Sequence, residues 1–141
     1  MPRIRKGDEP VATGRVHKDK KLADDVIRFS FRHFVAAEPF VWPIGEALGS
    51  YIEKLFDRLR EVSSISLSDF RTNKSRALRA HTHDWPRTTQ AAGFTHLNEQ
   101  LRGCEPWQFC LSANEHGRIH GLLIDEVFYV VWFDPNHALY S

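Results

Sequence analysis

The last third of the chain, residues 107–140, constrains the fold more strongly than any other stretch. Runs rich in β-branched and aromatic residues alternate there with turn-forming residues. Gly117 ends a polar turn, Asp125-Glu126 forms a two-residue hairpin loop, and Pro135 stops the last run because it has no N–H to donate to a ladder. This pattern predicts an antiparallel meander. Its three strands are expected at residues 107–113, 118–124 and 127–133.

The two-residue loop also predicts which side chains of the last two strands share a face. Counting from the loop sets Leu122 opposite Tyr129. Two residues further on, it sets His120 opposite Val131. Because side chains alternate with a period of two, Arg118, His120 and Tyr129 are expected on one face. The other face carries no ionisable group and is expected to pack on helices; it holds Ile119, Gly121, Leu123, Phe128, Val130 and Trp132. A β-bulge would exchange the two faces beyond it.

The elements before the meander define the fold class. Residues 25–34 alternate apolar and polar side chains, which predicts a half-buried strand, and residues 46–63 carry apolar side chains at helical spacing. Ser66, followed three residues later by Asp69, predicts the start of a short second helix that runs to about residue 73. The order strand, helix, helix and meander predicts an α+β fold, with an antiparallel sheet and the helices packed on one face.

Composition predicts how the chain is divided. Residues 1–22 are charged and show no periodicity, which predicts a flexible basic arm. Residues 23–141 are expected to form a single domain with an irregular insert at residues 74–105. Within this insert, residues 75–81 are compatible with a strand, and Thr95 with the N-cap of a helix that ends before Gly103.

The expected location is the cytoplasm, without a membrane segment. No apolar run approaches the roughly 18 residues needed to span a bilayer, and the polar N-terminus is unlike a secretory signal. Two cysteines do not make a disulfide framework, which favours a reducing compartment.

The small net charge of +1 conceals two basic zones. Residues 1–21 and residues 71–87 each carry a net charge of +4, so the remainder of the chain carries about −7. Two basic zones on an otherwise acidic chain favour local contacts with anions over general affinity for polyanions. The alternative is that each zone is a solvated tail or loop.

Eight histidines are more than a chain of 141 residues needs for packing. On a strand, His81 and His83 would share a face and offer metal ligands together with Asp84 or the pair Asp134 and His137. The alternative is a polar surface strand, because an HxH pair is common by chance and metal sites usually supply three or four closely spaced ligands.

A second cluster consists of His116, Arg118 and His120, with Tyr129 one rung away on the neighbouring strand. Arginine binds phosphate and stabilises the charge of a phosphoryl transition state, whereas histidine exchanges protons near neutrality. The alternative is an ordinary half-buried histidine beside a surface arginine. The C-terminal tail, residues 134–140, adds the imidazole of His137 and the phenol of Tyr140 near the end of the sheet. No nucleophile elbow, Walker loop, CxxC pair or dinucleotide fingerprint is present.

The order strand, helix, helix and three strands, followed by a tail with His137 and Tyr140, resembles the RelE/ParE superfamily of small toxins from toxin–antitoxin modules. The resemblance covers residues 26–73 and 107–140. RelE-like members cleave messenger RNA, often on the ribosome and without a metal, with Arg, Lys, His and Tyr side chains on an open sheet face. The resemblance implies that Arg118 contacts the phosphate and that His137 matches the histidine of the tail. The C-terminal tyrosine would be matched by Tyr129 or Tyr140.

The resulting hypothesis is a RelE-like toxin, a metal-independent endoribonuclease without a cofactor that cuts messenger RNA by attack of a 2′-hydroxyl on the adjacent phosphate. Its expected partners are RNA, including messenger RNA on the ribosome, and a small antitoxin protein. The candidate catalytic residues are Arg118, His120, Tyr129, His137 and Tyr140. The residues expected to steer the RNA strand are Arg71, Lys74, Arg76 and Arg79. Two alternatives are a non-catalytic module of the same fold that binds protein or DNA, and a His/Asp metal-dependent nuclease.

Overall fold

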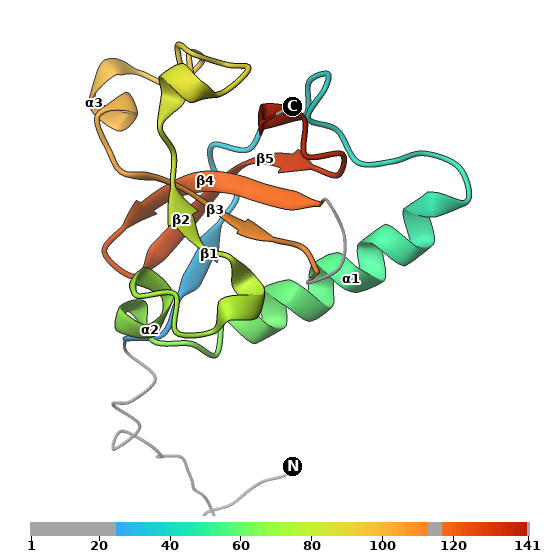
Figure 1. Ribbon diagram of the computed structural model, residues 1–141, viewed down its shortest axis with the longest axis horizontal. Coiled ribbons are helices and arrows are strands. Elements are labelled where there is room, and N and C mark those ends of the chain that lie inside the picture. The colour runs from blue at the N-terminus through green and yellow to red at the C-terminus, as the bar shows by residue number, and fades with distance from the viewer. Residues whose placement is uncertain (1–24, 113–116, 141) are drawn as a thin grey trace, which may run out of the picture.

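Five strands form one sheet within residues 25–112 and 117–140, the part of the protein that this computed structural model describes (Figure 1). The strands are β1 (Arg28–Ser30), β2 (His81–Thr82), β3 (Pro106–Cys110), β4 (Arg118–Ile124) and β5 (Val127–Asp134), and their order in the sheet is β1-β5-β4-β3-β2. Together with the helices, this sheet gives the α+β fold that the sequence predicts. The expected arm at residues 1–22 lies outside the described residues.

The C-terminal meander is confirmed, but the sheet is mixed and not purely antiparallel. Strands β3, β4 and β5 pair antiparallel, whereas β1 pairs parallel with β5, with Phe29 opposite Phe128. A parallel pair needs a long crossover between its strands, and the helices and the insert supply it. The prediction of an antiparallel sheet was therefore wrong at the β1 edge, because the alternation of residues 25–34 does not indicate the direction of the neighbouring strand.

A β-bulge at Val131 changes the predicted faces. The predicted register holds from the hairpin loop as far as Gly121, which lies opposite Val130, but His120 then lies opposite Trp132 and not opposite Val131. One extra residue in β5 reverses the alternation beyond it. As a result Trp132 lies on the face of His120, and the prediction that it would pack on the helices was wrong.

The helices cover the other face, as predicted (Figure 1). Helix α1 (Ala47–Val62) and helix α2 (Leu67–Arg71) follow the expected boundaries closely, and Ser66 caps α2 by accepting a hydrogen bond from the N–H of Asp69 at 3.1 Å. The buried core between helices and sheet includes Tyr51, Leu55, Leu59, Val62, Phe70, Ile119, Leu123, Phe128 and Val130. Ile52 and Phe56 belong to the predicted apolar stripe of α1, but they remain 40% and 63% exposed and lie outside this core. None of the described helices has the length and apolar character that crossing a bilayer requires.

The face of His120 is covered too, so the expected open sheet floor does not exist. A second core, formed by Phe40, Phe94, Leu97, Leu122, Val131, Trp132 and Leu139, lies on this side. Its covering segments include the later part of the insert and the C-terminal tail, with η3 (Trp85–Arg87), α3 (Glu99–Arg102) and η4 (Ala138–Tyr140). The first turn of the insert, η2 (Arg76–Leu78), packs through Leu78 in the core on the helix side. Residues 75–81 are thus mostly a 3₁₀ turn and not a strand, and α3 is capped by Asn98 and not by Thr95, since Asn98 Oδ1 accepts from the N–H of Leu101 at 2.9 Å.

Gly121 generates a stability prediction, because it lies beside the bulge with no room for a side chain. An added Cβ would overlap the carbonyl oxygen of Tyr129 and lie 2.6 Å from a ring carbon of Phe128. Gly121→Ala should therefore lower the free energy of unfolding by about 1–3 kcal/mol or more, measured by denaturant unfolding. The control is Gly49→Ala in α1, where nothing lies within 4 Å of the new Cβ. This variant should be neutral or stabilised by up to about 1 kcal/mol. Equal stability of the two variants would contradict the packing described here.

Candidate functional site

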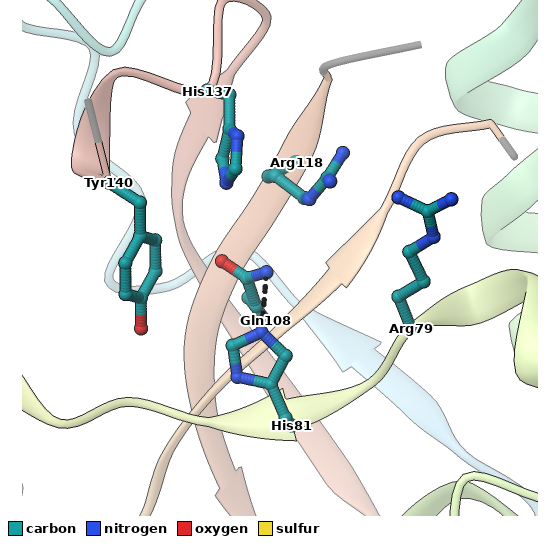
Figure 2. A pocket seen from close by; sticks show the side chains of 6 residues that line it. All are labelled: Arg79, His81, Gln108, Arg118, His137 and Tyr140. Carbon is teal, nitrogen blue, oxygen red and sulfur yellow. Dashed lines mark hydrogen bonds between the residues drawn. The ribbon is translucent and has the colours of Figure 1, made fainter. Parts of the chain in front are cut away.

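A cavity of about 310 Å³ opens on the face of the sheet that the insert and the tail cover (Figure 2). It collects side chains from five parts of the chain: the turn after η2, strand β2, strand β3, the start of β4, and the tail. Antiparallel pairing aligns them, since His81 lies opposite Gln108 and Cys110 lies opposite Arg118. The lining residues are Arg79, His81, Gln108, Arg118, His137 and Tyr140.

Two of these side chains project from turns in the left-handed backbone region. Arg79 has φ 49° and His137 has φ 56°. This conformation is uncommon for a residue with a Cβ and persists only where the surrounding structure holds it. Here the N–H of Arg79 bonds to the carbonyl of Arg76 at 3.1 Å, and that of His137 bonds to the carbonyl of Asp134 at 3.3 Å. Both unusual turns thus bring a polar side chain to the same cavity.

Behind the cavity, four side chains form a continuous chain of hydrogen bonds. The Tyr140 hydroxyl lies 2.6 Å from His83 Nδ1, and His83 Nε2 lies 3.0 Å from His120 Nδ1. His120 Nε2 lies 2.8 Å from Asp134 Oδ2. His120 and Asp134 are fully buried, whereas Tyr140 lines the cavity. The chain therefore connects the cavity with a buried carboxylate.

The carboxylate of Asp134 also holds the tail in place. Its Oδ1 accepts from the N–H of Ala138 at 2.7 Å, and its Oδ2 accepts from the N–H of Leu139 at 3.0 Å. Burial alone would raise the pKa of Asp134, but the hydrogen bond and charge of His120 and these two backbone donors lower the pKa below its usual range. The sequence suggested Asp134 as a possible metal ligand; the structure shows that its side chain caps the tail and orients an imidazole.

The hydrogen bonds fix where the protons of this chain lie. A carboxylate only accepts, so His120 donates through Nε2–H and its Nδ1 accepts from Nε2–H of His83. His83 Nδ1 is then left to accept from the Tyr140 hydroxyl. Burial lowers the pKa of His120, and burial together with the neighbouring His120 and His81 lowers the pKa of His83 to about 2. Burial raises the pKa of Tyr140. Neutral imidazoles and a protonated phenol fit this single arrangement.

A second pair of hydrogen bonds orients Gln108 at the floor of the cavity. His81 Nδ1 lies 2.8 Å from the carbonyl oxygen of Thr82, which only accepts, so Nδ1 carries the proton. His81 Nε2 then accepts from the Gln108 amide nitrogen at 2.9 Å (Figure 2). Gln108 is 2% exposed, and its Oε1 has no hydrogen-bond partner among the described residues. A buried acceptor without a partner costs free energy until a donor reaches it.

The structure brings together only some of the candidate catalytic residues. Arg118, His137 and Tyr140 line the cavity. Arg118 is only 6% exposed, and burial lowers its pKa, although a guanidinium stays charged at neutral pH. His120 shares the face of Arg118 but lies behind the cavity, where His83 and Asp134 occupy both of its nitrogens. It was expected to be accessible, and it is fully buried because the insert and the tail cover this face. Tyr129 packs beside His33, with ring centroids 5.6 Å apart, and is not a lining residue.

The basic zone of the insert is divided in the same way. Arg79 lines the cavity, whereas Lys74 and Arg76 are exposed and do not line it. Arg71 pairs with Glu105 at 2.8 Å and lies over the ring of Trp107. His116 lies outside the described residues. The sequence offered His81 and His83 as metal ligands or as part of a polar surface strand, and it gave no signal for Gln108. Among the described residues, no three His, Cys, Asp or Glu side chains are grouped to hold a metal ion.

The buried histidines generate a prediction for stability against pH. Because folding lowers the pKa of His83 and His120, the unfolded chain binds more protons than the folded protein once the pH falls below about 6.5. The free energy of unfolding should therefore fall between pH 7 and pH 5, by at most about 1.4 kcal/mol per pH unit for each histidine. Urea unfolding at several pH values measures this slope, which His83→Gln should reduce. The control is His96→Gln, which removes an exposed ring. A profile that is flat from pH 7 to pH 5 would contradict the prediction.

Compared with known proteins, the chain matches no family model, no curated protein and no solved structure. The function therefore has to be inferred from the cavity and from the hydrogen bonds behind it.

Proposed function

We propose that the protein is a metal-independent endoribonuclease that cleaves RNA by attack of a 2′-hydroxyl on the adjacent phosphate. One observation carries this proposal: a single cavity joins two guanidinium groups with imidazoles and a phenol. Arg79 and Arg118 lie together on one side, and Tyr140 lies on the other (Figure 2). A phosphodiester fits this division, because its phosphate is an anion while its ribose hydroxyl exchanges a proton during cleavage.

The two arginines supply the electrostatic part of the reaction. A guanidinium binds phosphate through paired N–H donors and stabilises the charge that grows on the phosphate oxygens in the transition state. Arg118 is buried at the start of β4, where the sheet holds it rigidly, and Arg79 is exposed on a turn. This arrangement suits one fixed phosphate contact and a second contact at the rim.

The tail supplies an imidazole for proton transfer and a phenol beside it. His137 and Tyr140 both line the cavity, with ring centroids 5.8 Å apart. General acid and base catalysis requires a proton-exchanging group within reach of the reacting oxygens, and His137 has this role, while the Tyr140 oxygen accepts a hydrogen bond from the substrate. Their rings also offer surfaces on which a base can stack. The cavity is at the small end of ligand sites, about 300–1,000 Å³ in proteins, so it admits one nucleotide unit.

We further propose that this activity is that of a RelE-like toxin, with messenger RNA as substrate and a small antitoxin protein as partner. The order of the elements supports this resemblance: a strand, two helices, and a C-terminal meander with a His/Tyr tail. The covered sheet face is a departure from an open-faced nuclease. Substrate access would then be through the cavity at the edge of the covered face, between β2 and the tail.

Cleavage of an RNA oligonucleotide tests the nuclease directly. The purified protein with EDTA should produce fragments that end in a 2′,3′-cyclic phosphate and begin with a 5′-hydroxyl, and it should leave the 2′-deoxy oligonucleotide intact. Arg118→Gln removes the charge but keeps most of the side-chain volume, and it should slow cleavage by about 10²-fold or more. The matched control is Arg60→Gln, at an exposed arginine of helix α1 outside the cavity. Absence of cleavage, or cleavage that EDTA abolishes, would refute the proposal.

Growth on expression tests the toxin. Induction of the wild-type chain in bacteria should arrest growth, and Arg118→Gln expressed to the same level should relieve the arrest, because the effect would require cleavage of cellular RNA. Arg60→Gln should remain toxic. Normal growth in the presence of abundant folded wild-type protein would contradict the toxin proposal. The nuclease proposal would then depend only on the cleavage assay.

A further inference from the structure

The cavity presents hydrogen-bond donors on one side and acceptors on the other. Arg79 and Arg118 contribute only N–H donors. Across from them lie Tyr140 and Gln108, and Figure 2 shows the buried Oε1 of Gln108 turned away from His81. A ligand that satisfies both sides carries an anionic acceptor next to a hydroxyl donor. A ribose 3′-phosphate has this combination, and its deoxyribose counterpart lacks the donor.

The hydrogen-bond chain behind Tyr140 decides that its oxygen is an acceptor. The carboxylate of Asp134 sets the tautomer of His120, His120 sets that of His83, and His83 Nδ1 then takes the phenol proton at 2.6 Å. The Tyr140 proton is thus directed away from the cavity. A phenol oxygen accepts hydrogen bonds as well as donating one, so the Tyr140 oxygen can still accept from a ligand.

We propose that Asp134, His120 and His83 are positioning residues that hold Tyr140 as a hydrogen-bond acceptor, and that Tyr140 and Gln108 together recognise the 2′-hydroxyl of a ribonucleotide. This inference rests on the proposed function and adds how RNA is distinguished from DNA. The 2′-hydroxyl would donate to these oxygens while the adjacent phosphate contacts the arginines. The Gln108 oxygen, buried and without a partner among the described residues, supports it independently of the histidine chain.

The Asp134→Asn variant tests the direction of the hydrogen bonds between Asp134 and Tyr140 separately from the positions of their heavy atoms. With the amide oxygen kept on the N–H of Ala138, the amide nitrogen faces His120 Nε2 and donates where the carboxylate accepted, at the cost of the bond from the N–H of Leu139. Every proton in the series of hydrogen bonds then reverses. His120 Nδ1 then donates to His83, and His83 Nδ1 donates to Tyr140, whose own proton turns into the cavity. A buried aspartate that sets a histidine tautomer in a serine protease shows the same sensitivity to this exchange. The heavy atoms need not move for Tyr140 to change from acceptor to donor.

Binding of ribonucleoside 3′-monophosphates and their 2′-deoxy counterparts tests this without requiring cleavage. The wild-type protein should prefer the ribo form by about tenfold or more, because the deoxy form leaves buried acceptors unpaired. Tyr140→Phe and Gln108→Met should each reduce the preference while retaining affinity that depends on the phosphate. The control is Tyr51→Phe, which removes a buried hydroxyl from a different part of the molecule. Equal binding of both forms by the wild type, or a preference unchanged in Tyr140→Phe, would overturn the inference.

The ¹⁵N NMR signals of the imidazoles give a second readout that is independent of ligand and activity. In the wild type, His83 and His120 should both be Nε2–H tautomers, and in Asp134→Asn both should change to Nδ1–H, with loss of the ribo preference. The carboxylate also holds the tail, so Asp134→Asn could fail to fold. In that case the tautomers of the wild type and the binding preference of Tyr140→Phe still test the inference. Nδ1–H signals in the wild type would refute the positioning role. Selective binding without cleavage would refute the nuclease and keep the recognition site.

Discussion

The buried carboxylate of Asp134 is the interaction on which the site depends. It is fully buried, yet three donors reach it: His120 Nε2 and the N–H groups of Ala138 and Leu139. A buried charge is tolerated only when hydrogen-bond donors reach it in this way. Loss of the carboxylate would leave these buried donors without an acceptor, which costs free energy. The same three bonds fix the ring of His120 against one face of the sheet and hold the tail that carries Tyr140. Stability and site geometry are therefore coupled through one side chain.

The bulge at Val131 makes this interaction possible. In a regular ladder Asp134 would alternate onto the helix side of the sheet, against the apolar core of α1. The extra residue sets Asp134 opposite Arg118, on the face of His120, and moves Trp132 with it. Trp132 then stacks on Phe40 with ring centroids 4.2 Å apart, which closes the second core. One inserted residue in β5 thus supplies both the polar centre of this face and the aromatic packing around it.

The sequence predicted the elements whose causes are local. The meander, the cap at Ser66 and the span of α1 follow from periodicity and turn chemistry, and these were confirmed. The parallel pairing of β1 and the bulge depend on contacts between distant segments, which no local pattern shows. The same distinction holds for the site. His137 and Tyr140 were suggested by their position in the tail, whereas the partnership of His83 with His120 links residues 37 positions apart.

The arrangement of charge around the cavity explains why a nearly neutral protein would still select an anion. Only Arg79 from the basic zone of the insert reaches the cavity, and it meets Arg118 from a strand far along the chain. Two guanidiniums at one wall create a local field, and low-dielectric surroundings strengthen it at Arg118. The remaining basic residues of that zone face solvent or pair with acids, as Arg71 does with Glu105. Such a site contacts a single phosphate together with the ribose hydroxyl next to it. Binding of an extended polyanion would need all the basic residues of the zone on one surface, whereas the fold distributes them over several surfaces.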